Sequence, residues 1–217
     1  MARSSLGVQA ERLSVDPMEV DQILEGGATT IMLRSLPSST TTSSLMGLMG
    51  QSFLNAYDFL YLPWCTRQPR RIVEMAFINF VDHFWAKRAV ELFLETIRHG
   101  SPSWARTRVS QARIQGLGPN LAYFTLRFGE AAITDPDAPS VFVDGHVVSL
   151  AEHCATHINA DAMRLARSVL EKESHPRALR SREQVDVIWV APSMGLSELL
   201  ELANRHQQRL GYAIFRL

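Results

Sequence analysis

Residues 73–82, VEMAFINFVD, contain the pattern that most restricts how this chain can fold. Ile78 and Phe80 lie an even number of positions apart, so on a pleated strand they share one face. Met75 and Phe77 then share the other face. An aromatic ring exposed in the middle of a sheet offers a flat surface on which an RNA base can stack. The segment therefore predicts a central strand with one buried face and one binding face.

Three further strands and two helices are predicted around this segment. We expect strands at 29–34, 57–62 and 107–114, which are rich in β-branched or aromatic residues. One helix should follow the Ser/Thr run at 38–44, and another should begin at Asp82, which can cap it. The order strand, helix, strand, strand, helix, strand indicates an α+β, ferredoxin-like fold. Such a four-stranded antiparallel sheet has helices on one face, which leaves the other face free to bind.

We predict three parts along the chain. Residues 1–28 are polar, small and acidic and are expected to form a flexible leader, although a short helix is compatible with 18–24. Residues 29–128 form the ferredoxin-like domain. Residues 129–217 are expected to form an α/β extension or a small second domain. Within it we predict a hairpin turning at Asp144 and Gly145, a helix at 150–173, strands at 185–190 and 212–217, and a helix at 196–210.

Charge is unevenly distributed along a chain whose formal net charge is zero. Residues 29–118 carry ten Lys or Arg against five acidic residues, whereas the segments on either side are net negative. A local basic excess favours a polyanionic partner. Within it, Arg67, Arg70 and Arg71 stand close together in a loop, and the pattern is compatible with phosphate binding or with a solvated hairpin loop.

Several functional classes are not indicated by the sequence. Cys65 and Cys154 have no paired spacing, which argues against a disulfide framework and favours a reducing compartment, the nucleus or the cytoplasm. His153 and His157 would share a helix face, but no further ligand follows at a metal-site spacing, so we expect neither a metal nor another cofactor. Phosphate-binding glycine loops and nucleophile motifs are missing from the sequence, so no catalysis is expected. No apolar run approaches the ~20 residues that cross a bilayer, so no membrane partner is expected.

Four blocks of the sequence resemble the RNA-recognition motif of the Mei-two-like (meiosis-two) proteins, a eukaryotic RNA-binding family. The blocks are TTIMLRSLP at 29–37, YDFLYLP at 57–63, MAFINFVD at 75–82 and ARIQG at 112–116. The resemblance covers roughly residues 29–128 and implies a further helix near Phe124. It also implies non-catalytic binding of single-stranded RNA across the sheet, with a role in post-transcriptional, meiotic or developmental gene regulation.

The resemblance implies which residues contact RNA. It places the family's stacking positions on Met32 of the first strand and on Met75 and Phe77 of the third. Strand alternation adds Phe59 and Tyr61 to the same face, if Leu60 and Leu62 point into the core. On the fourth strand we expect Ala112 and Ile114 to face the core and Gln111 and Arg113 to face outward. The polar residues expected to bind phosphates or base edges are Arg34, Arg70, Arg71, Gln111 and Arg113.

A second function is compatible with the same fold. Glu74 and Met75 stand where RNA-recognition motifs usually have a glycine and an aromatic residue. Because a stacked base contributes about 1–3 kcal/mol, losing such positions weakens RNA binding. A degenerate motif of this kind is what a protein–protein interaction module would show. The basic excess favours RNA, whereas Glu74 and Met75 favour a protein partner.

Overall fold

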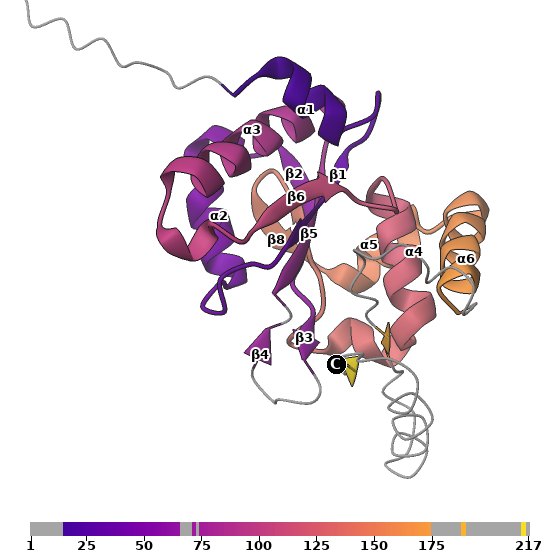
Figure 1. Cartoon of the computed structure of the whole chain (residues 1–217). Coiled ribbons are helices and arrows are strands. Elements are labelled where there is room, and N and C mark those ends of the chain that lie inside the picture. The colour runs from indigo at the N-terminus through magenta and orange to yellow at the C-terminus, as the bar shows by residue number, and fades with distance from the viewer. Residues whose placement is uncertain (1–14, 66–70, 73, 175–187, 190–213, 216–217) are drawn as a thin grey trace, which may run out of the picture.

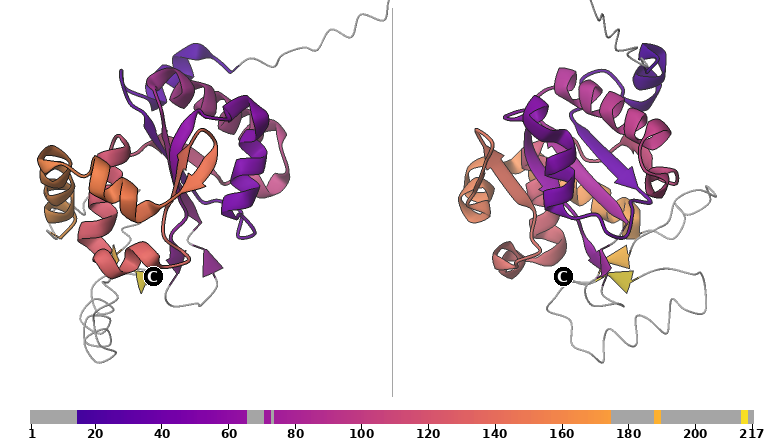
Figure 2. Two further views of the ribbon diagram at one scale, coloured as in Figure 1. Left: turned by 180° about the vertical axis from the view of Figure 1, so that it is seen from behind. Right: turned by 90° about the vertical axis from the view of Figure 1, so that its left-hand side faces the viewer.

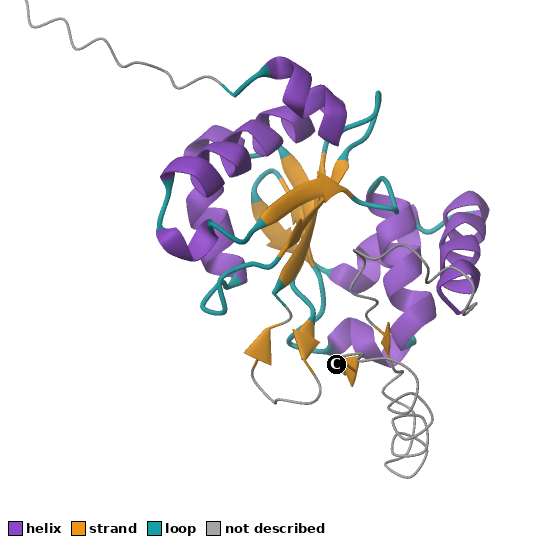
Figure 3. Cartoon of the chain, viewed as in Figure 1, coloured by secondary structure: helices purple, strands orange, loops and turns teal. Residues whose placement is uncertain are grey.

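The centre of the structure is a six-stranded sheet in which every neighbouring pair is antiparallel, in the order β6-β1-β5-β2-β7-β8. The computed structural model describes residues 15–65, 71–72, 74–174, 188–189 and 214–215. The strands of the sheet are β1 (Thr30–Arg34), β2 (Tyr57–Tyr61), β5 (Met75–Phe80), β6 (Arg108–Gln111), β7 (Ser140–Val143) and β8 (His146–Val148). Figures 1 and 3 show that this sheet lies between two groups of helices.

The predicted α+β, ferredoxin-like fold is confirmed by four of these strands and two helices. Strands β6-β1-β5-β2 are neighbours in that order, with α2 (Thr42–Met49) following β1 and α3 (His83–His99) following β5. Asp82 caps α3 as predicted, because its Oδ1 accepts the amide of Trp85 at 3.0 Å. Helix α2 begins at Thr41, whose hydroxyl accepts the amide of Ser44 at 3.0 Å.

A first hydrophobic core fills the space between the sheet and helices α1, α2 and α3. The side of β5 that carries Ile78 and Phe80 lies in this core and is fully buried, as the alternation predicts. Ile31 and Leu33 of β1 add the neighbouring row. Helix α3 contributes Phe93, which is buried beneath the helix.

The segment before β1 belongs to this core from residue 15 onward, so the prediction of a flexible leader is wrong for residues 15–28. Helix α1 (Pro17–Ile23) begins at Asp16, whose carboxylate accepts the amide of Met18 at 2.9 Å. Val20 and Leu24 are buried in the first core. These two apolar residues, one helical turn apart, and the ion pairs of Glu19 with Arg98 and of Asp21 with Lys87 hold the segment against α3.

Residues 129–174 extend the same layers. Strand β7 pairs with β2, and β8 pairs with β7 across a turn in which Asp144 and Gly145 have φ values of 50° and 76°. Positive φ at both positions is the geometry of the predicted two-residue hairpin. The helix predicted at 150–173 is divided in two, because Asn159 interrupts it and accepts the amide of Ala162 at 2.9 Å.

The remaining elements are short or belong to this extension. Two helices, α5 (Leu150–His157) and α6 (Ala160–Ser174), follow β8. Strands β3 (Trp64–Cys65) and β4 (Arg71–Ile72) pair beyond β2 and β5, and β9 (Ile188–Trp189) pairs in parallel with β10 (Ile214–Phe215). Single turns of 3-10 helix cover Gly50–Phe53, Pro102–Trp104 and Glu130–Thr134. The helix predicted at 196–210 lies outside the described residues.

Phe93→Ala should lower the free energy of unfolding by about 3–5 kcal/mol, because it empties a fully buried position in the first core. Urea denaturation followed by circular dichroism measures this loss. Phe84→Ala is the matched control, since that ring is on the same helix but is 62% exposed. The control should lose less than about 1 kcal/mol. Equal losses in the two variants would contradict the orientation of α3.

Candidate nucleic-acid interface

Helix α4 (Leu117–Phe128) covers part of the sheet face that a ferredoxin-like fold leaves open. It follows β6 and lies with α5 and α6 on the side of the sheet opposite α2 and α3 (Figures 1 and 2). Leu121 and Phe124 of α4 form a second core with Phe59 and Tyr61 of β2. The rings of Tyr61 and Phe124 meet edge to face, with centroids 5.5 Å apart. The further helix expected near Phe124 is therefore present, and it lies on the predicted binding face.

Phe59 and Tyr61 share the sheet face of Phe77, but the expectation that they form open surface is wrong. Leu60 and Leu62 point into the first core, as this arrangement requires. Phe59 is 2% exposed and Tyr61 is 7% exposed. Neither ring has a free face for a base in this structure, because α4 occupies the space above them.

A buried hydrogen-bond network holds the start of α4 against β1 and β5. The Thr30 hydroxyl donates to Asn79 Oδ1 at 2.6 Å and accepts from Asn120 Nδ2 at 3.2 Å. Gln115 Oε1 accepts the amides of Thr29 and Thr30 at 2.7 and 2.8 Å, which folds the loop before α4 back onto β1. Because buried polar groups are destabilising unless they are paired, this network determines where α4 crosses the sheet.

Two titratable groups lie at the edges of this covered region. Asn79 Nδ2 donates to Asp58 Oδ1 at 2.7 Å. Burial raises the pKa of the Asp58 carboxyl, and the bond from Asn79 opposes part of that rise. Burial also raises the pKa of the Tyr61 hydroxyl. Tyr123 of α4 raises this pKa slightly further, and the positive charge of Arg127 lowers it slightly. Tyr61 therefore remains protonated at neutral pH beside these α4 groups.

The uncovered part of the face is centred on four residues of β1 and β5, namely Met32, Arg34, Met75 and Phe77, which we call the open patch. Met32 is opposite Phe77 and Arg34 is opposite Met75. All four are half-buried, whereas Thr30 at the other end of β1 is fully buried. The three stacking positions implied by the family resemblance are thus neighbours in the open patch.

Strand β6 places Ser110 opposite Met32 and Arg108 opposite Arg34 at the edge of the open patch. The Nε of Arg34 and the Oγ of Ser110 are buried, and neither has a hydrogen-bond partner within the part of the chain that the structure describes. Such atoms are uncommon in native proteins. Arg34 and Ser110 thus form a polar border of the open patch.

The predicted orientation of β6 is wrong by one residue. Gln111 is opposite Ile31, whose side chain lies in the first core, and Gln111 Oε1 accepts the amide of Glu25 at 2.7 Å. Gln111 therefore lies on the side of α1, away from the open patch. Ala112 is buried, but its amide donates to Thr30 O, so Ala112 is opposite Thr30 and shares the face that α4 covers. Its apolar side chain was therefore assigned to the wrong core. The polar residues of β6 that share the face of Met32 are Arg108 and Ser110, which alternate with Gln111 along the strand.

The other arginines predicted to bind RNA have different positions. Arg113 lies beyond β6, and its Nη1 is 3.3 Å from Glu173 Oε1 of α6. Arg71 belongs to β4, beyond the ends of β2 and β5. Arg70 lies outside the described residues.

The described residues contain no group of three or more His, Cys, Asp or Glu side chains that could hold a metal ion. The rings of His153 and His157 stack on each other, with centroids 5.5 Å apart and planes 18° apart. Within the same residues, none of the helices is both long enough and apolar enough to span a bilayer.

Comparison with known proteins agrees with the resemblance of the four sequence blocks. No protein-family model matches the chain. Over 128 residues the chain is 27% identical to protein MEI2-like 4 of Oryza sativa subsp. japonica. The match covers 55% of this chain but 12% of the rice protein, so the chain corresponds to a small part of that relative. The chain is thus similar to a segment of a Mei-two-like protein.

Thr30→Val should lower the free energy of unfolding by about 1–3 kcal/mol, because it removes the hydroxyl that bonds Asn79, Asn120 and the Gly116 amide. Thr156→Val is the matched control, since Thr156 is exposed and its hydroxyl donates to Glu152 O within α5. Urea denaturation of the two variants makes the comparison. A loss of similar size in both would contradict the role of the network in holding α4.

Proposed function

We propose that this chain binds single-stranded RNA without catalysis, through the open patch formed by Met32, Arg34, Met75 and Phe77. The observation that carries the proposal is the strand register that sets Met32 opposite Phe77 and Arg34 opposite Met75 on one half-buried face. The family resemblance and the similarity to protein MEI2-like 4 support the same function. The role that the resemblance implies, regulation of RNA in the nucleus or cytoplasm, is part of the proposal.

The chemistry of the open patch suits a base and its phosphate. The ring of Phe77 would stack on a base, and the thioethers of Met32 and Met75 would make polarisable contacts at the edges of the base. Arg34 would donate to a phosphate or base edge, and the Ser110 hydroxyl would bond beside it. Because residues two apart on a strand are about 7 Å apart, the open patch has room for about two bases.

Replacing Phe77 by Leu tests the proposal, since it removes the ring but keeps apolar packing beside the second core. Fluorescence anisotropy of labelled single-stranded RNA should report affinity about 10-fold weaker than wild type, since one stacked base contributes about 1–3 kcal/mol. Phe84→Leu is the control, because its ring is exposed on α3, on the other side of the sheet. Equal affinity of wild type and Phe77→Leu would contradict stacking on the open patch.

A protein partner is the second candidate. The observation that favours it is the burial of Phe59 and Tyr61 under α4, since this removes surface that an RNA-recognition motif uses for stacking. The same titration separates the two candidates. Absence of RNA binding up to about 50 µM protein would reject the RNA proposal and favour a protein partner.

A further inference from the structure

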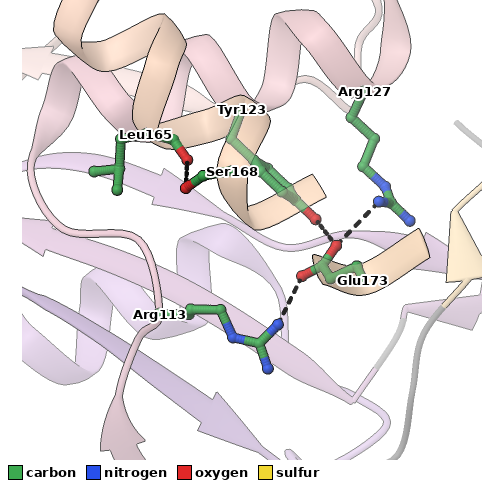
Figure 4. Close-up of polar contacts among 6 residues, drawn as sticks. All are labelled: Arg113, Tyr123, Arg127, Leu165, Ser168 and Glu173. Carbon is green, nitrogen blue, oxygen red and sulfur yellow. Dashed lines mark hydrogen bonds and ion pairs between the residues drawn. The ribbon is translucent and has the colours of Figure 1, made fainter. Parts of the chain in front are cut away.

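One carboxylate near the end of α6 is bound by three side chains from two other segments (Figure 4). Glu173 Oε2 accepts from the Tyr123 hydroxyl at 2.8 Å and lies 3.1 Å from Arg127 Nη1. Its Oε1 lies 3.3 Å from Arg113 Nη1. Tyr123 and Arg127 belong to α4, whereas Arg113 follows β6. The three donors thus converge on one anionic group.

These donors would bind a phosphate as well as a carboxylate. A guanidinium group presents several N–H donors in a plane and matches either anion. The Arg127 side chain is only 11% exposed, and its guanidinium lies 5.8 Å from the centroid of the Tyr123 ring, so it is held in place. Burial raises the pKa of Tyr123, with Glu173 adding to the rise. The Tyr123 hydroxyl therefore keeps its proton and donates at neutral pH.

We propose that Arg113, Arg127 and Tyr123 form a phosphate site for single-stranded RNA, which Glu173 occupies as an intramolecular competitor. This inference rests on the proposed RNA binding, since it adds a phosphate contact and a means of regulation to the same ligand. The Arg113 side chain is 47% exposed and that of Glu173 is 31% exposed. An incoming phosphate can therefore reach the cluster from solvent.

Glu173 can leave the site without displacing α6. It lies one residue from the end of the helix Ala160–Ser174, where the last carbonyls have no partner within the helix and the backbone frays. The apolar packing of α6 against α4 lies nearer the start of α6, where Ala162 and Ala166 pack against Ala122. Rotation of one side chain in the last turn therefore opens the site.

The site also lies on the RNA-binding side of the sheet. Tyr61 is opposite Phe77 of the open patch. The Tyr61 ring meets Phe124 of α4 edge to face, and Phe124 is the residue after Tyr123. RNA that stacks on Phe77 and continues toward α4 would meet this cluster.

Glu173→Gln should strengthen binding of a fluorescein-labelled oligouridine of about twelve nucleotides by about 5-fold, because the neutral amide no longer competes with phosphate. A plot of log affinity against log salt should also steepen by about 0.7, the value for one additional phosphate contact on a single strand. Asp161→Asn is the control, because it removes the same charge from the same helix, where Asp161 pairs with the exposed Arg164. Its affinity and salt slope should equal those of wild type.

A second variant tests the site itself. Arg113→Gln removes one donor from an exposed position, so it should fold, and it should abolish the gain when combined with Glu173→Gln. If Glu173→Gln does not fold, Arg113→Gln alone should weaken binding and flatten the salt slope. If affinity and salt slope are unchanged in the Glu173 variant while Phe77→Leu still weakens binding, the cluster is a structural ion pair and the proposed phosphate site is rejected. Absence of RNA binding in every protein would instead reject the proposed function, and the phosphate site with it.

Discussion

The packing of α4 over Phe59 and Tyr61 is the contact on which the rest of this structure depends. It gives the sheet a second core, and burial of each large apolar side chain stabilises the fold by about 1.5–3 kcal/mol. Helix α4 then has an outer side of its own, where Ala122 packs against Ala162 and Ala166 of α6. The segment after residue 129 completes the cover, because Val141 of β7 and Leu150 of α5 close the second core.

This cover explains where a ligand can bind. The Thr30 end of β1 and residues Phe59 and Tyr61 of β2 are closed by apolar contacts and by the buried network, whereas the Arg34 end of the face is half-buried. Two arginines lie at that end, with Arg34 in the open patch and Arg108 opposite it on β6. In the proposed function, their electrostatic attraction for a phosphate would offset the stacking area that α4 covers.

The sequence predicted the four central strands and α3 because their signals are local: alternation in 73–82 and a capping aspartate at position 82. Three features depend on contacts between distant residues and escaped prediction. The apolar residues of α4 identify a helix but not the surface it covers, and Thr30 and Asn79 show their role only once strands are paired. Ala112 is buried from the α4 side, which concealed the true orientation of β6 and hence the place of Ser110.

The most direct test of RNA binding on the open patch is nuclear magnetic resonance of methionine methyl groups during titration with oligouridine. Met32 and Met75 lie in the open patch, whereas Met49 belongs to α2 and is buried in the first core. RNA bound on the open patch should shift the methyl signals of Met32 and Met75 and leave that of Met49 unchanged. Shifts confined to Met49 or to methionines outside the open patch, at RNA concentrations that saturate binding, would contradict the account.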